Sequence, residues 1–173
     1  MITNQTITSL LRKTPIISVF LHRLNARQEE IIHLLRKTAI FADLSESELV
    51  GLLHLLHERS FTQGEMIFKE GEPGLGLYVI LKGEVEVKKA TADGKSRIAR
   101  LGHGEVFGEV SFLDGGNRSA TVIATVKTTL IGFYRTELFH LLDRRPALAS
   151  KILLALARQI GIRMRAMLQL IQS

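Results

Sequence analysis

The chain has 173 residues, of which 46% are hydrophobic and 23% charged, as expected for one globular domain with its own core. A net charge of +6 favours an anionic partner, which can be a nucleotide, nucleic acid or an acidic protein surface. Because the sequence contains no cysteine, disulfides, thiolate nucleophiles and cysteine-ligated metals are excluded. The apolar runs are too short to cross a bilayer and the amino end lacks a secretory signal, so we expect a cytoplasmic protein without a membrane partner.

The first third of the chain has the hydrophobic spacing of helices. Apolar residues repeat every three or four positions in two runs, Ile31, Leu34 and Leu35, then Leu49, Leu52, Leu53 and Leu56. Ser45 followed by Glu48 forms a capping box, which predicts a helix that begins near Ser45.

Between Ser60 and Tyr134 the hydrophobic period changes to two, which is typical of strands. Gly83 predicts a turn, and Asp93-Gly94 predicts a hairpin. The predicted strands cover residues 77–81, 84–88, 96–101, 121–125 and 130–134. Many short strands with glycine turns indicate an antiparallel barrel or jelly roll.

The last segment, from Pro146 to Gln172, has the pattern of one long helix. Its stripe has the alternating spacing of a coiled-coil seam and consists of Leu153, Leu156, Ile160, Arg163, Met167 and Leu170. We therefore expect a homodimer through this helix. The predicted fold class is α+β, an antiparallel jelly-roll barrel flanked by N-terminal helices and one long C-terminal helix. The predicted divisions are a helical extension at 1–38, a β-roll at 39–145 and a lid and dimerisation helix at 146–173.

The segment 106–121 contains the residues with the clearest binding chemistry. If residues 109–113 form a short helix, its first amides favour a phosphate, and Arg118 would add forked bonds to the phosphate oxygens. Glu109 beside an anion is unfavourable unless the ligand offers a hydrogen-bond donor. A 3′,5′-cyclic nucleotide meets both conditions, because it carries one negative charge and a free ribose 2′-hydroxyl.

From about Ile40 onward the sequence resembles the cyclic nucleotide-binding domain family. Phe107-Gly108-Glu109 with the following Arg118-Ser119-Ala120-Thr121 is similar to the phosphate-binding cassette of that family. Gly71-Glu72-Pro73-Gly74, before the strand at 77–81, is similar to one of its barrel turns.

The resemblance implies a role for each residue of the cassette. Glu109 and the Gly108 backbone would hold the ribose hydroxyl, and Arg118 would hold the cyclic phosphate with help from Ser119. The C-terminal helix would close over the base and supply Gln159, Arg163 and Met167, with Arg163 either touching the purine or extending to solvent. The predicted ligand-binding residues are Gly108, Glu109, Val110, Ser111, Arg118, Ser119, Ala120 and Arg163.

The predicted function is a non-catalytic regulatory module that couples ligand binding to movement of the C-terminal helix. We expect cAMP, with cGMP as the alternative because Ser119 could bond guanine, and no metal. His54 and His57 lack a third ligand, and no P-loop or nucleophile elbow is present. The alternatives are a scaffold that only dimerises and a relative of transcription regulators that acts through nucleic acid. We expect an unknown effector protein and no sequence-specific nucleic acid, because no helix-turn-helix follows the long helix.

Overall fold

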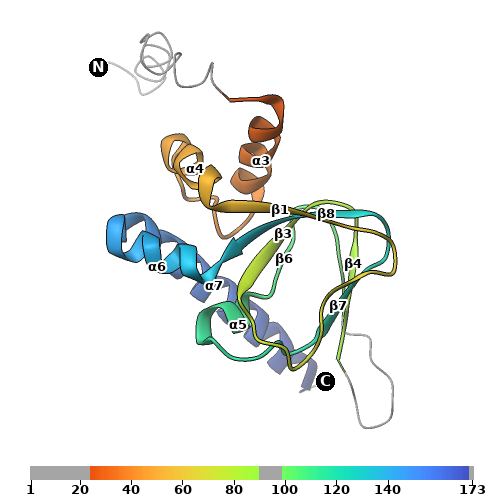
Figure 1. The fold of residues 1–173 in the computed structure, drawn as a ribbon. Coiled ribbons are helices and arrows are strands. Elements are labelled where there is room, and N and C mark those ends of the chain that lie inside the picture. The colour runs from red at the N-terminus through yellow and green to blue at the C-terminus, as the bar shows by residue number, and fades with distance from the viewer. Residues whose placement is uncertain (1–23, 90–98, 172–173) are drawn as a thin grey trace, which may run out of the picture.

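The computed structural model describes residues 24–89 and 99–171, and it has an α+β fold in which two antiparallel sheets form a jelly roll flanked by helices (Figure 1). The helices are α3 (Ala26–Lys37), α4 (Glu46–Leu52), the 3₁₀ helix η1 (Leu53–Leu55), α5 (Glu109–Asp114), α6 (Arg135–Arg144) and α7 (Pro146–Ile171). The strands are β1 (Leu56–Phe61), β2 (Met66–Phe68), β3 (Gly76–Lys82), β4 (Val85–Lys88), β5 (Ala99–Leu101), β6 (Val106–Phe107), β7 (Thr121–Ala124) and β8 (Thr128–Tyr134).

One sheet has the order β1-β8-β3-β6 and the other has the order β2-β7-β4-β5. Strand β3 is buried on both faces. Leu77 and Val79 belong to a core shared with the helices, whereas Ile80 belongs to a second core inside the barrel. Burial on both faces explains why residues 77–81 form a nearly continuous apolar run.

Most of the predicted elements are confirmed. The helix after Ser45 begins at Glu46 with both hydrogen bonds of the capping box, and the strands predicted near 77–81 and 130–134 are β3 and β8. The Asp93-Gly94 hairpin and the first residues of the strand predicted at 96–101 lie outside the described residues.

The prediction that Leu56 continues the helical run is wrong. The α-helix ends at Leu52, η1 provides one tighter turn, and Leu56 pairs with Phe133 as the first residue of β1. Pairing of β1 with β8 along the whole length of β1 outweighs the helical spacing of the leucines.

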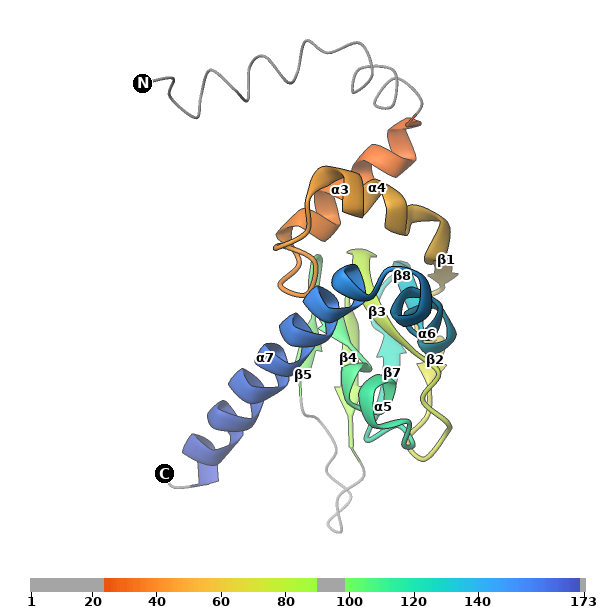
Figure 2. The same ribbon diagram turned by 90° about the vertical axis from the view of Figure 1, so that its left-hand side faces the viewer.

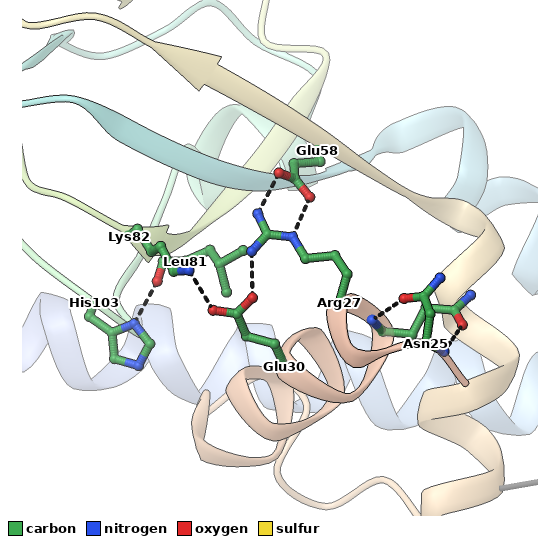
Figure 3. A network of polar contacts seen from close by, with 8 residues as sticks. Asn25, Arg27, Glu30, Glu58, Leu81, Lys82 and His103 are labelled. Atoms are coloured by element: carbon green, nitrogen blue, oxygen red, sulfur yellow. Dashed lines mark hydrogen bonds and ion pairs between the residues drawn. The ribbon is translucent and has the colours of Figure 1, made fainter. Parts of the chain in front are cut away.

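Ion pairs join α3 to two strands of the first sheet (Figure 3). Arg27 bonds both carboxylate oxygens of Glu58 on β1, and it also pairs with Glu30 on its own helix. Glu30 in turn lies 2.9 Å from the ammonium of Lys82 at the end of β3. Together with buried apolar residues of α3, these contacts fix the helix against the barrel.

Helix α7 starts at α6 and runs along the barrel, and its C-terminal end lies far from α3 (Figure 2). Its first half is embedded in the core through Leu148, Ala149, Ile152, Ala155 and Leu156. Leu156 is fully buried within the chain, so the stripe that resembles a coiled-coil seam partly faces the chain's own core. Among the described residues, no helix is sufficiently long and apolar to cross a membrane.

Candidate functional site

A pocket of about 460 Å³ lies between the barrel, α5 and α7, and this volume falls in the range of ~300–1,000 Å³ typical of small-molecule sites. All eight residues predicted from the sequence line this pocket, namely Gly108, Glu109, Val110, Ser111, Arg118, Ser119, Ala120 and Arg163. The fold therefore brings the cassette and the C-terminal helix to one cavity.

Helix α5 begins after Gly108, which confirms the short helix predicted at 109–113. Gly108 has a φ of +82°, a left-handed conformation that favours glycine. A Cβ at this position would lie 2.6 Å from a terminal nitrogen of Arg118. Glycine is therefore required here both by the backbone turn and by the close approach of the guanidinium.

The guanidinium of Arg118 is held from three directions by the protein. One terminal nitrogen donates to the Gly108 carbonyl at 3.1 Å and to the Ser111 hydroxyl at 2.9 Å. The other donates to the Gly76 carbonyl at 2.7 Å. These bonds fix the plane of the guanidinium and leave its Nε for another partner.

Arg118 is only 4% exposed, and the carbon of its guanidinium lies 4.0 Å from the centroid of the Phe68 ring. Its Nε is buried and has no hydrogen-bond partner within the described part of the chain. Burial lowers the pKa of Arg118 from its ordinary value, because the cation has lost solvent. A buried cation with one unsatisfied donor is suited to an anionic ligand, and a phosphate oxygen would satisfy it.

The backbone that carries Arg118 is fastened to the glycine-rich turn before β3. The Arg118 amide donates to the Glu72 carbonyl at 2.8 Å, and the Gly71 amide donates to the Arg118 carbonyl at 2.9 Å. Gly74 lies so close to Ser111 that a Cβ would come within 2.2 Å of the serine hydroxyl. The glycine-rich turn at residues 71–74, which was predicted only to be a barrel turn, therefore also positions Arg118.

Glu109 is 4% exposed and pairs with Arg163 of α7. Arg163 bonds Oε1 of Glu109 and also donates to the Val106 carbonyl at 2.8 Å. From the sequence, Arg163 was expected either to touch the purine or to extend to solvent. Neither expectation included Glu109, the residue with which Arg163 pairs in the structure. No residue in the described part of the chain donates to the second carboxylate oxygen of Glu109, Oε2, which can therefore accept from another donor.

The remaining wall of the pocket is mostly apolar and comes from both sheets and the helix. Strands β4 and β5 contribute Val87, Ala99 and Leu101, and α7 contributes Gln159, Ala166 and Met167. Ser119 lies at the exposed rim. Such a wall suits the flat apolar faces of a heterocyclic base.

Three groups that shape the site were not predicted from the sequence. Phe68 covers the guanidinium of Arg118, and the carbonyls of Gly76 and Val106 accept hydrogen bonds from the two arginines. The carbonyls could not be predicted from the sequence, since every residue has one. Phe68, in contrast, is an aromatic residue shortly before the glycine-rich turn and could have been named as a candidate. In the described ranges, no group of three histidine, aspartate or glutamate side chains could hold a metal ion.

The fold and the pocket together define a jelly-roll ligand-binding domain whose cassette presents a buried arginine and a buried glutamate. Residues 58–145 match the cyclic nucleotide-binding domain family, and the chain belongs to that family.

Relatives of this chain include regulators, channels and kinase subunits. The cyclic AMP receptor protein of Thermus thermophilus is 34% identical over 127 residues, which cover 73% of this chain and 59% of that protein. A putative potassium channel protein of Rhodopseudomonas palustris is 36% identical over 116 residues, covering 67% of this chain and 28% of the channel. The chain thus spans between about a quarter and three fifths of the length of these two relatives.

Solved structures have the same fold. A cyclic nucleotide-binding domain from Methylobacillus flagellatus has a TM-score of 0.73 and 33% identity, with 81% of this chain and 79% of that one covered. The catabolite activator protein of Thermus thermophilus has a TM-score of 0.68 and 33% identity, with coverage of 78% and 63%.

Proposed function

We propose that this chain binds cAMP in the pocket between the barrel and α7, and that it acts as a non-catalytic regulatory module. The observation that carries the proposal is the buried guanidinium of Arg118, whose Nε has no partner within the described residues and whose neighbour Glu109 retains a free carboxylate oxygen. Arg118 would take the cyclic phosphate, and Oε2 of Glu109 would accept the ribose 2′-hydroxyl. Gly108, Val110, Ser111, Ser119 and Ala120 would complete the contacts.

The charges around the pocket favour a monoanion. Two arginines and one glutamate lie at its inner wall, which leaves one positive charge. Glu105 also lines the pocket, but its carboxylate is exposed and accepts from the Gly102 amide at 2.7 Å. A cyclic phosphodiester carries one negative charge and would balance this wall, whereas a linear monophosphate carries nearly two at neutral pH.

Adenine is proposed over guanine because the strands offer apolar side chains to the base. Val87, Ala99 and Leu101 have no group that bonds a guanine edge, and the Ser119 hydroxyl lies at the exposed rim. We expect cGMP to bind more weakly at the same site.

We also propose that binding is coupled to α7 and that two copies pair through its outward face. Several apolar side chains of this helix that do not line the pocket are about half exposed or more, namely Leu154, Ile162, Met164 and Leu168. If the protein binds the ligand more tightly when α7 is in one position, binding shifts the helix toward that position. An effector protein that contacts α7 would then respond to the ligand.

Thermal unfolding with added nucleotide tests the binding proposal. cAMP at about one hundred times its dissociation constant should stabilise the fold by roughly 2.7 kcal/mol. Matched samples with cGMP test selectivity for the base, and samples with linear 5′-AMP test selectivity for the cyclic phosphate. An unfolding temperature that none of the three nucleotides raises at millimolar concentration would contradict the proposal.

A further inference from the structure

Three turns within the described part of the barrel share one hydrogen-bond pattern. Each has four residues, with glycine third and glutamate fourth, and they are Thr62-Gln63-Gly64-Glu65, Lys69-Glu70-Gly71-Glu72 and Gly102-His103-Gly104-Glu105. The three glycines have φ values of +82°, +87° and +82° in chain order. In each turn the glutamate amide donates to the carbonyl of the first residue, at 3.1, 3.2 and 3.1 Å. The same local sequence pattern therefore folds into the same turn three times.

The carboxylate of the fourth residue closes each turn. Its Oε2 accepts from the backbone amide of the first residue, at 2.8 Å for Glu65, 2.9 Å for Glu72 and 2.7 Å for Glu105. A carboxylate that accepts from a backbone N–H forms a charge-assisted hydrogen bond, as it does at the start of a helix. All three side chains are exposed, so they stabilise their turns through this bond and not through burial.

Each turn also holds one residue from elsewhere in the chain by two backbone hydrogen bonds. The glycine amide donates to the carbonyl of the held residue, and the amide of the held residue donates to the glutamate carbonyl. The held residues are Ala124, Arg118 and Ile80, and the six bonds measure between 2.8 and 3.0 Å. Ala124 and Ile80 belong to the core inside the barrel, whereas Arg118 carries the buried charge of the pocket. One of three equivalent turns thus holds a binding residue.

We propose that Glu72 is a positioning residue, whose carboxylate closes the turn that fixes the main chain of Arg118 at the pocket. This inference rests on the proposed function, because that function gives Arg118 the cyclic phosphate. The Gly76 carbonyl and the Ser111 hydroxyl hold the guanidinium, while the turn holds the backbone of the same residue. Both ends of the arginine are therefore placed before a ligand arrives.

The same turn region is bonded to the chain on both sides of Arg118. The Glu70 amide donates to the Thr121 hydroxyl at 3.0 Å, and the Gly74 amide donates to the Gly116 carbonyl at 3.2 Å. Opening of the turn would loosen the whole segment that presents the arginine. The carboxylate that closes the turn lies outside the residues that line the pocket, so it acts on the ligand only through that segment.

Glu72 also acts on Arg118 through its charge. Burial lowers the pKa of Arg118, and the negative charge of Glu72 is among those that oppose this effect. Glu72→Gln separates the two actions, because the glutamine amide oxygen can accept the same backbone hydrogen bond without carrying a charge.

Hydrogen exchange followed by NMR, on protein without added nucleotide, tests the turn by itself. Glu72→Ala should speed exchange of the Arg118 amide by about fivefold, since loss of a charge-assisted bond favours local opening. Glu65→Ala is the matched control, because it removes the same bond from the equivalent turn and should speed exchange of the Ala124 amide instead. Unchanged exchange at Arg118 in the Glu72 variant would overturn the role of the carboxylate, whether or not the chain binds nucleotides.

Calorimetry with cAMP tests the positioning role. Glu72→Ala should bind cAMP about threefold to tenfold more weakly, because a smaller fraction of the protein has Arg118 in place. Glu65→Ala should lower the unfolding temperature to a similar extent but retain wild-type affinity, which separates positioning from general stability. Glu72→Gln should regain most of the affinity, because it restores the acceptor.

Two binding results would overturn the proposal. One is equal affinity of the two alanine variants, and the other is binding by Glu72→Gln that is as weak as binding by Glu72→Ala. If wild type does not bind cAMP, the proposed function fails, while the exchange experiment still judges whether Glu72 fixes the backbone of Arg118.

Discussion

The guanidinium of Arg118 lies 4.0 Å from the ring centroid of Phe68, on the inner wall of the barrel. The ring excludes water from one face of the cation and attracts it through its π electrons. Strand β2, which is only three residues long, therefore contributes directly to the binding site.

Phe68→Leu should weaken cAMP binding by about 1 kcal/mol, since leucine fills much of the space but lacks the π face that holds the guanidinium. Isothermal titration calorimetry measures the effect. Phe139→Leu is the matched control, because Arg135 lies 5.3 Å from the centroid of that exposed ring outside the pocket. Equal affinities in the two variants would show that Phe68 does not support Arg118.

Gly108→Ala should impair both stability and binding. Gly108 and Gly104 share a φ of +82°, so alanine at either position should cost about 1–2 kcal/mol in backbone strain. Only at Gly108 would the new Cβ contact Arg118, at 2.6 Å, whereas nothing lies within 4 Å at Gly104. Gly104→Ala should therefore retain normal cAMP affinity, and Gly108→Ala should bind about tenfold more weakly. Equally impaired binding in both variants would contradict the proposed contact.

The ion pairs of α3 should make stability fall in acid. The Arg27 guanidinium holds the pKa of Glu58 below its ordinary value of 4.5, so the stabilisation is present above that pH and is lost as the pH falls through the lower folded-state value. Urea titrations between pH 6 and pH 3 should show a smaller acid loss for Glu58→Gln than for wild type, by about 0.5 kcal/mol because the pair is partly exposed. The control is Glu29→Gln, at an exposed position of α3, which should follow the wild-type curve. If Glu58→Gln also follows that curve, the pair does not stabilise the fold.

Pairing of two copies through α7 predicts a mass near twice 19.3 kDa in light scattering. Ile162→Glu should shift the protein to the monomer, because it places a charge among the exposed apolar side chains of the helix. A wild-type monomer at high micromolar concentration would contradict the dimer proposal.

The sequence predicted the elements whose burial is regular. Residues 77–81 read as a strand because β3 is buried on both faces, and Ser45 with Glu48 marked the start of α4 through a local hydrogen-bond exchange. Strand β1 was not predicted, since its burial pattern is mostly exposed and its hydrogen bonds come from the distant β8. Strands β2 and β6 are too short, at three and two residues, for a period to appear.

The candidate site was predictable as far as it is local in sequence. The cassette residues lie within about a dozen positions of one another, and they line one pocket together with Arg163. The partner of Arg163 could not be inferred, because Glu109 is 54 positions away and the pair depends on how α7 crosses the barrel. The aromatic cover of Arg118 and the carbonyls that hold it depend in the same way on tertiary packing.

The most direct measurement is calorimetry of cAMP binding to wild type and to Arg118→Ala, with Arg100→Ala, at an exposed position on β5, as the control. Removing one side of a desolvated charge pair should cost about 2–5 kcal/mol, so the Arg118 variant should lose at least about thirtyfold in affinity while the Arg100 variant matches wild type. Circular dichroism establishes that each variant is folded. Wild-type affinity in a folded Arg118→Ala protein would contradict the assignment of this arginine to the cyclic phosphate.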